Sequence, residues 1–277
     1  MDRRDFLETT VGATLGATFA LATLPVMADS VIVTDSAGLQ ADVVQIKSGE
    51  QTIRAYRAQP EAKKNLPVIL VVSEIFGVHA HIADVARRFA KLGYLAIAPD
   101  LFARQGDPSS YSSIPDLLKN IVAKVPDAQV MQDLDACVSW SAEHGGDIKR
   151  LGVTGFCWGG RITWMYAAHN HKVQAAVAWY GKLVNEKNTL QPQTPIEIAP
   201  DLHVPVLGLY GGKDSSIPPD IVERMRAALA KGSSGSEIVV YPDAGHAFHA
   251  DYRPSYVAAD ARDGWLRCVG WLRKFGV

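Results

Sequence analysis

Residues 155–160 read GFCWGG and lie between a segment typical of a strand and a segment typical of a helix. The preceding segment, residues 150–154, is short and largely apolar, while residues 158–169 carry the apolar spacing of a helix. Glycines on either side of Cys157 allow the two elements to pack closely, and the tight turn strains the cysteine so that its side chain points out of the sheet. The chain must therefore fold so that a strand turns sharply into a helix, with Cys157 at the turn.

Cys157 is also expected at the N-terminus of the helix, where the helix dipole and unpaired N–H groups stabilise negative charge. This position favours a thiolate and a developing oxyanion, so we interpret Cys157 as a nucleophile. The alternative is a buried structural cysteine, which is the commoner state of a lone cysteine. No G-x-S-x-G pattern occurs in the chain, so no serine competes for the role.

The first 28 residues have the layout of an export signal. Arg3 and Arg4 precede an uncharged stretch, residues 9–28, that is rich in Ala, Thr and Gly. We interpret it as a twin-arginine signal that is cleaved after Ala28. A permanent membrane helix or a packed N-terminal helix is the alternative, but the threonines and Pro25 disfavour both. We therefore expect export by the twin-arginine (Tat) machinery to the periplasm or the exterior, and no stable membrane span in the mature protein.

The charge balance argues against a polyanionic partner. The chain has 28 basic and 29 acidic residues, and the predicted signal contains two of the former and three of the latter. The mature chain is then formally neutral, with no overall field to attract nucleic acid or anionic lipid. A small-molecule partner is the better expectation, and about 250 residues suit a single α/β enzyme.

The cysteine content is too low for a disulfide scaffold, because the chain has three cysteines. Cys137 and Cys268 lie in apolar helical patterns and are interpreted as buried core residues. A disulfide between them in the oxidising periplasm is the open alternative.

Short apolar runs alternate with longer helical patterns over residues 41–277, which predicts one doubly wound α/β domain after a short lead at residues 29–40. Alternation around a turn glycine predicts an opening hairpin of residues 41–47 and 51–58. Short apolar runs predict buried parallel strands at 67–72, 94–98, 150–154, 174–179, 204–210 and 237–241. Helical spacing predicts helices at 79–92, 127–143, 158–169, 219–230 and 254–274. An ordered loop near the strand ends is expected at residues 185–201, which hold three prolines and no periodicity.

Two residues that could complete a nucleophilic site follow predicted strands. Asp214 lies just past residues 204–210, and His246 lies just past residues 237–241. Ligands of open α/β sheets bind at the carboxyl ends of the strands, and in folds with this turn the acid and then the histidine follow the nucleophile. Either residue alone is more simply interpreted as solvent-exposed. As an ordered set they predict a Cys157–His246–Asp214 triad.

Five segments of the chain form a series, namely SEIFG at 73–77, PDLFAR at 99–104, GFCWGG at 155–160, GGKD at 211–214 and AGHAF at 244–248. In this order they resemble the dienelactone hydrolase (carboxymethylenebutenolidase) family of the α/β-hydrolase superfamily, over residues 41–277. The resemblance implies a single, mostly parallel sheet with helices on both faces. It also implies that Cys157 hydrolyses lactone or ester bonds through an acyl-enzyme.

The resemblance further implies roles for residues around the thiol. Glu74 is expected to hold the resting thiol until a substrate carboxylate displaces it, and Arg104 is expected to bind that carboxylate through its planar guanidinium. The backbone N–H groups of Ile75 and Trp158 are expected to form the oxyanion hole. A solvated loop acid and a surface arginine are the simpler interpretations of Glu74 and Arg104.

The chain departs from the family pattern after His246. Family members that act on dienelactone often carry a second arginine shortly after the catalytic histidine, whereas here the first arginine is Arg253. Whether Arg253 reaches the substrate therefore bears on whether dienelactone itself is the substrate. Phe248 and Trp158 adjoin catalytic positions and are expected to line the pocket, although aromatic residues at such positions are as often core.

Paired histidines raise the question of a metal site, but no CxxC or HExxH pattern accompanies them; the pairs are His79 with His81, His169 with His171, and His246 with His249. We expect no metal and no other cofactor. Three other functions stay open: a broader carboxylesterase or thioesterase with the same catalytic residues, a non-catalytic binding protein on the same scaffold, and a redox role for Cys157.

Overall fold

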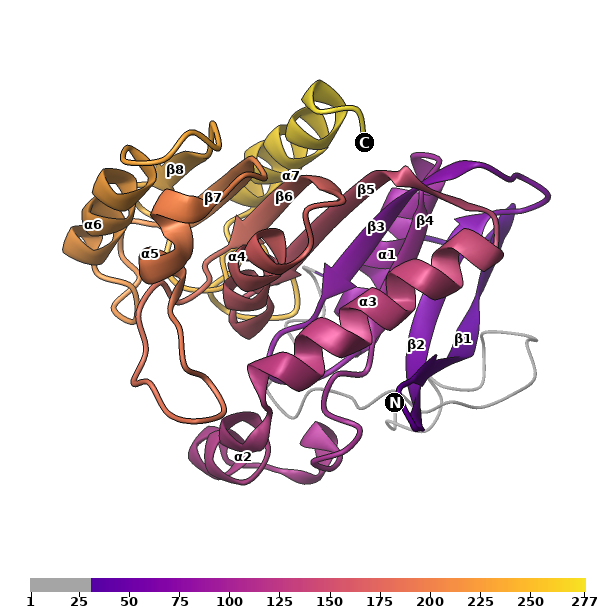
Figure 1. Cartoon of the computed structure of the whole chain (residues 1–277), viewed down its shortest axis with the longest axis horizontal. Coiled ribbons are helices and arrows are strands. Elements are labelled where there is room, and N and C mark those ends of the chain that lie inside the picture. Colours follow the sequence, from indigo (N-terminus) through magenta and orange to yellow (C-terminus); the bar gives the residue numbers. More distant parts are fainter. Residues whose placement is uncertain (1–30) are drawn as a thin grey trace, which may run out of the picture.

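The structure is a computed structural model that describes residues 31–277, and the predicted export signal lies outside the described residues. The described strands form one sheet in the order β1-β2-β4-β3-β5-β6-β7-β8 (Figure 1). The β1–β2 and β2–β4 pairs are antiparallel, and every other pair is parallel. The strands are β1 (Leu39–Ser48), β2 (Gln51–Pro60), β3 (Leu66–Val72), β4 (Leu95–Pro99), β5 (Gly146–Phe156), β6 (Val173–Trp179), β7 (Val206–Gly211) and β8 (Glu237–Tyr241).

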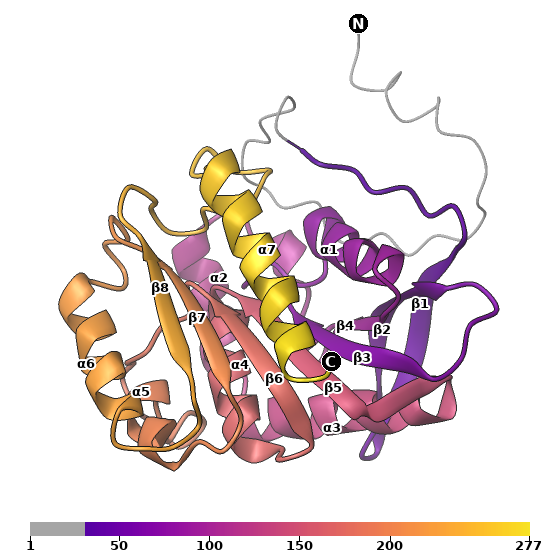
Figure 2. The same cartoon turned by 90° about the horizontal axis from the view of Figure 1, so that it is seen from above.

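Helices cover both faces of this sheet. Figure 2 shows α1 and α7 on one face and α3 and α4 on the other. Strands β3, β6 and β7 are buried along nearly their whole length, as a sheet covered on both sides requires. The α-helices are α1 (Ala80–Lys91), α2 (Ile114–Asn120), α3 (Asp127–Glu143), α4 (Trp158–His169), α5 (Pro195–Ile198), α6 (Pro219–Leu229) and α7 (Ala258–Lys274). Short 3₁₀ turns lie at Pro108–Ser110, Val122–Lys124 and Ala199–Asp201.

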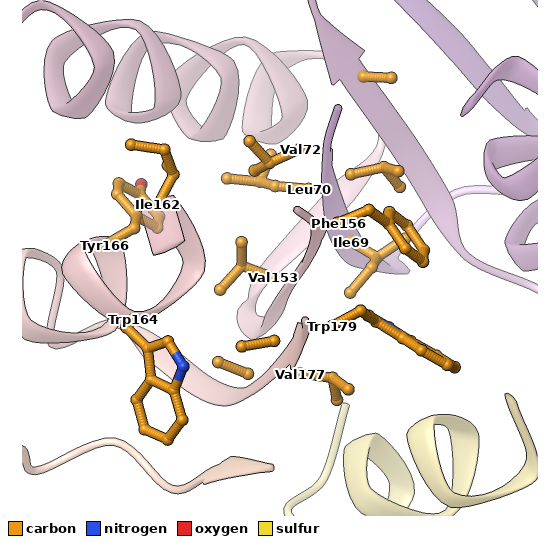
Figure 3. Close-up of a cluster of buried hydrophobic side chains, with 14 of the residues drawn as sticks. Ile69, Leu70, Val72, Val153, Phe156, Ile162, Trp164, Tyr166, Val177 and Trp179 are labelled. Atoms are coloured by element: carbon orange, nitrogen blue, oxygen red, sulfur yellow. The ribbon is translucent and has the colours of Figure 1, made fainter. Parts of the chain in front are cut away.

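A dense part of the core lies where β3, β5 and β6 pack against α4 (Figure 3). The Trp179 indole stacks on Phe156 with ring centroids 5.4 Å apart, and its N–H donates to the Thr154 hydroxyl at 3.1 Å. The Trp164 indole N–H likewise donates to the Tyr210 hydroxyl at 3.0 Å. Because these buried polar groups are satisfied, the aromatic side chains fill the core without a desolvation penalty. They form a rigid base beneath the turn between β5 and α4.

The predicted fold class is confirmed, and α3, α4 and β8 have the predicted bounds. Helix α7 begins at Ala258, later than the predicted residue 254. The preceding residues form turns, and Val257 N–H donates to the Phe248 carbonyl at 3.0 Å. Helix α2 is absent from the sequence prediction, because its seven residues provide too little periodicity.

The segment 185–201 is ordered, but it is not wholly irregular as the sequence predicts, because it contains α5. Thr194 and Glu197 form a capping box at the start of this helix. Arg161 on α4 anchors the rest of the segment by donating to the Gln193 carbonyl at 3.0 Å. The three prolines of the segment favoured a loop in the sequence prediction, although proline at the first helical position is compatible with a helix start.

Residues 31–38 run along α1 before β1 begins at Leu39. The Ile32 N–H donates to Asp251 at 3.2 Å, and the Thr34 N–H donates to Asp84 at 2.5 Å. These contacts fasten the N-terminal arm to the body of the domain. Within residues 31–277, no helix is long and apolar enough to cross a membrane.

Cys137 and Cys268 are both free and fully buried, which confirms their interpretation as core residues and leaves no disulfide between them. Burial raises the pKa of Cys268 to about 12. Both thiols are therefore unreactive, and Cys157 is the partly exposed cysteine.

Candidate active site

Cys157 occupies a strained turn between β5 and α4. Its φ is 56° and its ψ is −114°, a region that residues with a side chain rarely adopt. Its N–H donates to the Trp179 carbonyl at 3.0 Å. A Cβ at Gly155 would lie 2.2 Å from the Gly159 carbonyl oxygen, and one at Gly159 would lie 2.4 Å from the Val72 oxygen. The two glycines therefore allow the close contact that holds the cysteine in this conformation, as the sequence predicts.

His246 and Asp214 lie in the loops after β8 and β7, and the structure brings them together. His246 Nδ1 is 2.7 Å from Asp214 Oδ2, and Asp214 is buried. The other carboxylate oxygen accepts two hydrogen bonds from Ser216, one from the hydroxyl at 2.6 Å and one from the N–H at 2.9 Å. Asp214 is thus fixed from two sides and orients the imidazole.

The Cys157 thiol also acts on His246, because it contributes to the pKa of the imidazole. With Nδ1 bound to Asp214, Nε2 is the nitrogen left for the sulfur. Burial lowers the pKa of His246, but its hydrogen bonds to Asp214 and Cys157 raise the pKa to about 10. The raised pKa keeps a proton on the imidazole at neutral pH. The three residues that the sequence selected do converge in space.

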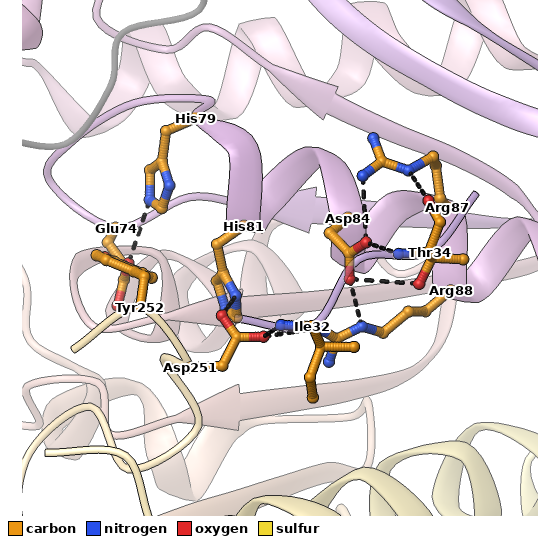
Figure 4. A network of polar contacts seen from close by, with 10 residues as sticks. All are labelled: Ile32, Thr34, Glu74, His79, His81, Asp84, Arg87, Arg88, Asp251 and Tyr252. Carbon is orange, nitrogen blue, oxygen red and sulfur yellow. Dashed lines mark hydrogen bonds and ion pairs between the residues drawn. The ribbon is translucent and has the colours of Figure 1, made fainter. Parts of the chain in front are cut away.

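Glu74 follows β3 and is completely buried. The Tyr252 hydroxyl donates to Glu74 Oε2, and His79 Nε2 lies 3.4 Å from the same oxygen (Figure 4). Burial raises the pKa of Glu74, but His79 and Tyr252 lower it overall to about 2, so the carboxyl is ionised. Glu74 is therefore not the solvated acid of the simpler interpretation. Its partners in this structure are Tyr252 and His79.

Ile75 and Trp158 supply backbone N–H groups on either side of the turn. Trp158 is the first residue of α4, so its N–H has no acceptor within the helix. Ile75 lies in the turn that follows β3. The side chain of Trp158 is half-buried and packs on Phe102 with ring centroids 4.7 Å apart. The oxyanion hole stays a prediction with suitable geometry at Trp158.

Arg104 forms an ion pair with a buried aspartate. Its two terminal nitrogens lie 2.6 Å and 2.8 Å from the carboxylate oxygens of Asp133 on α3, which is completely buried. Asp133 also accepts a hydrogen bond from Ser48 at 2.5 Å. The two-pronged face of the guanidinium therefore binds a carboxylate of the protein itself. In this structure the Asp133 carboxylate occupies the guanidinium, and the role of Arg104 in holding a substrate carboxylate stays a prediction.

The structure separates Phe248, which lies in the core, from Arg253, which lies near the site. Phe248 is completely buried and packs on Tyr241 with ring centroids 4.9 Å apart, so it is core and not pocket lining. Arg253 is half-buried, with its guanidinium 5.8 Å from the centre of the Phe76 ring. Its charge acts on Tyr180 and Tyr252, which also face Glu74. Arg253 therefore lies at the site, and no ion pair between it and an acid occurs within the described residues.

Three residues near the site were not selected from the sequence, namely Ser216, Tyr252 and His79. Ser216 follows Asp214 by two residues, a spacing at which a serine can bond back to an aspartate, and this signal was available. Tyr252 and His79 meet Glu74 only through the tertiary structure, because Tyr252 is 178 residues away in the sequence.

A strained cysteine at a strand-to-helix turn, joined to a histidine and an aspartate from two later loops of this sheet, defines an α/β hydrolase. The profile of the Dienelactone hydrolase family matches residues 53–276. The chain belongs to this family of hydrolases, which confirms the resemblance inferred from the five segments.

Proteins of known name are similar over most of the chain. A "putative carboxymethylenebutenolidase" of Methylorubrum extorquens is 54% identical over 98% of this chain and 93% of that protein. A protein of the same name from Escherichia coli K12 is 54% identical over 93% of this chain and 95% of its own length. The crystal structure of a "putative dienelactone hydrolase" from Klebsiella pneumoniae superimposes with a TM-score of 0.84. It is 57% identical and covers 86% of this chain and 99% of that one.

Proposed function

We propose that this protein hydrolyses lactone and ester bonds through an acyl-enzyme on Cys157. The observation that carries the proposal is the strained Cys157 at the strand-to-helix turn, together with His246, which Asp214 holds at 2.7 Å. The arrangement has the parts that nucleophilic acyl transfer needs: a nucleophile, a base and an orienting acid.

In the first half-reaction, the Cys157 sulfur forms a bond to the substrate carbonyl carbon, and the carbonyl oxygen becomes an oxyanion. The N–H groups of Trp158 and Ile75 are the donors proposed to stabilise it. The protonated His246 then gives its proton to the departing alkoxide oxygen as the C–O bond breaks. A thioester forms, and in a lactone the released hydroxyl stays on the acyl chain.

In the second half-reaction, His246 is neutral and takes a proton from water. The hydroxide adds to the thioester carbonyl, the C–S bond breaks, and the thiolate is restored beside the protonated His246. The product is a carboxylic acid, and the catalytic pair returns to its starting charges.

We further propose that Arg253 favours substrates that bear a carboxylate. The half-buried guanidinium at the site supports this role, and the Phe76 ring beneath it supports the orientation of the charge. Arg253→Gln should raise KM for anionic esters about 10–100-fold and change KM for neutral esters little. Arg262→Gln is the matched control, because Arg262 is exposed on α7.

The chemistry is tested by turnover of purified protein on a panel of lactones and aryl esters. Cys157→Ala should lower kcat/KM by about 10³-fold or more, whereas Cys268→Ala, which removes a buried thiol, should keep most of the activity. Mass spectrometry should detect an acyl adduct on Cys157. If the wild type turns over none of the panel, or if Cys157→Ala is as active as the wild type, the proposal is wrong.

The same panel separates a dienelactone hydrolase from a broader carboxylesterase or thioesterase. One observation favours the broader carboxylesterase or thioesterase: the first arginine after His246 is Arg253, seven residues later, and no arginine lies closer to the histidine on that side. A preference for dienelactone over simple aryl esters supports the first function, and comparable turnover of both supports the second.

A further inference from the structure

Ser216 contacts both Asp214 and His246. Its hydroxyl donates to Asp214 Oδ1 at 2.6 Å and lies 3.3 Å from His246 Nδ1. The Ser216 N–H donates to the same Oδ1 at 2.9 Å, while His246 Nδ1 is 2.7 Å from Oδ2. The serine, the carboxylate and the imidazole thus form a closed ring of polar contacts on the Nδ1 side of the imidazole.

The buried carboxylate of Asp214 depends on this serine. Among the described residues, no lysine or arginine forms an ion pair with Asp214, and the donors that reach its side chain belong to Ser216 and His246. An ionised carboxylate has about four lone-pair sites to satisfy. Without the Ser216 hydroxyl, Oδ1 would keep a single N–H donor inside the protein.

The protonation states decide the direction of these hydrogen bonds. Burial raises the pKa of Asp214, but hydrogen bonds from His246 and Ser216 lower it overall. The carboxyl is therefore ionised at neutral pH and acts as an acceptor. The hydroxyl proton of Ser216 points to Asp214, so its oxygen is left as a second, weaker acceptor for the His246 Nδ1–H. Rotation of the imidazole away from Asp214 would weaken both contacts.

The backbone of Ser216 is held by its neighbours. Ile217 is buried, and its N–H donates to the Asp214 carbonyl at 3.2 Å. Pro218 and Pro219 follow and lead into α6, which restricts the backbone further. Ser216 itself is exposed. Removal of its hydroxyl should therefore disturb the contacts of Asp214 and His246 and leave the fold intact.

We propose that Ser216 is a positioning residue, whose hydroxyl fixes the Asp214 carboxylate and steadies the His246 imidazole in the orientation that proton transfer needs. The proposal rests on the proposed function, since it concerns the base of the same reaction. Ser216 acts through Asp214 and His246 and not through contact with the substrate. Because the orientation of the imidazole governs proton transfer, the effect of Ser216 belongs to kcat.

The kinetic test is hydrolysis of an aryl ester by variants of Ser216. Ser216→Ala should lower kcat about 10-fold and change KM little, because a hydrogen bond to a charged group is lost. Ser216→Thr keeps a hydroxyl and should restore most of kcat. Ser215→Ala, which changes the exposed serine next to it, is the matched control and should follow the wild type. An unchanged kcat in Ser216→Ala, or Ser216→Thr as slow as Ser216→Ala, would overturn the proposal.

A second comparison separates positioning through Asp214 from a general effect of the mutation. In an Asp214→Asn background the carboxylate is absent, so Ser216→Ala should lower kcat by less than about 2-fold. Equal losses in the two backgrounds would show that Ser216 acts independently of Asp214 and would overturn the proposal.

Proton NMR of the protein without substrate gives a readout that needs no turnover. The His246 Nδ1–H proton, assigned by its absence in His246→Gln, should exchange with water about 10-fold faster in Ser216→Ala, because the ring of contacts around it is broken. Ser215→Ala and Ser216→Thr should match the wild type. An unchanged exchange rate in Ser216→Ala would overturn the proposal, and this rate decides the question if Asp214→Asn turns over too slowly to be measured.

Hydrolysis and proton exchange are independent readouts. A wild type that hydrolyses no substrate of the panel but shows the expected exchange series refutes the proposed function and not the positioning by Ser216. Normal hydrolysis with the same exchange rate in every Ser216 variant refutes the positioning alone.

Discussion

At the residue scale, the strained conformation of Cys157 depends on the absence of side chains at the neighbouring glycines. The cysteine has a positive φ, and the missing side chain of Gly159 lets α4 approach the end of β3. The same approach places the thiol at the N-terminus of α4. The strain at Cys157 is thus maintained by packing, and a single added methyl group tests it.

Gly159→Ala should destabilise the protein by at least about 1–3 kcal/mol, because the new Cβ would lie 2.4 Å from the Val72 carbonyl oxygen. Gly270→Ala is the control, since Gly270 is an exposed residue of α7 and no atom lies within 4 Å of a Cβ added there. That variant should gain about 0.5–1 kcal/mol from helix propensity. Urea unfolding of both variants measures the two changes, and equal effects would contradict the packing argument.

At the scale of elements, Asp251 joins three segments that are far apart in the sequence. It lies 2.9 Å from His81 and 2.9 Å from Arg88 on α1, and it accepts the Ile32 N–H of the N-terminal arm (Figure 4). The arm, α1 and the loop after β8 thus share one buried carboxylate. Loss of this charge should loosen the arm and the loop that carries Tyr252.

Asp251→Asn should lower the free energy of unfolding by about 1–3 kcal/mol at pH 7. Burial raises the pKa of Asp251, but hydrogen bonding to His81 and the nearby positive charges lower it overall. A lowered pKa contributes stability that is present above the ordinary value of 3.8 and is lost as pH falls through the lowered pKa. The difference between wild type and variant should therefore be constant above about pH 5 and shrink below about pH 4.

Denaturant unfolding from pH 7 to pH 3 measures this difference. Asp201→Asn, which changes an exposed aspartate, should follow the wild type throughout. A difference that grows on acidification would contradict the assignment of Asp251 as an ionised member of the network.

At the scale of the whole molecule, Arg104 links the β1–β2–β4 side of the sheet to helix α3. It follows β4, binds Asp133 on α3, and through Asp133 is linked to Ser48 at the end of β1. This is a structural ion pair, and without the guanidinium the buried carboxylate of Asp133 would lose its cation.

Arg104→Gln should cost about 3–5 kcal/mol of unfolding free energy, because it leaves the Asp133 charge buried without its cation. Hydrolysis of anionic and neutral esters by the folded fraction should fall alike. The comparison with Arg253→Gln in the same kinetic assay separates a structural arginine from a substrate-binding one. A selective loss on anionic esters in Arg104→Gln would support the role implied by the resemblance.

Export is also a property of the whole chain, and we propose that residues 1–28 direct it through the twin-arginine route. Replacing Arg3 and Arg4 by lysine in the full-length precursor should retain the protein in the cytoplasm, measured by cell fractionation. The chain that begins at Asp29 should show the same circular dichroism as the exported protein. A wild-type precursor that stays cytoplasmic contradicts the proposal.

The sequence by itself determined the fold class and the approximate positions of most elements, and it selected Cys157, Asp214 and His246 as the candidate catalytic set. These depend on local periodicity, on the glycines of one turn and on the order of residues after strands, all of which are legible along the chain. The partners of individual side chains were decided only by the tertiary structure. Arg104 and Asp133 are 29 residues apart, and Glu74 and Tyr252 are 178 apart. Packing chooses which buried charge meets which donor, and no local pattern records that choice.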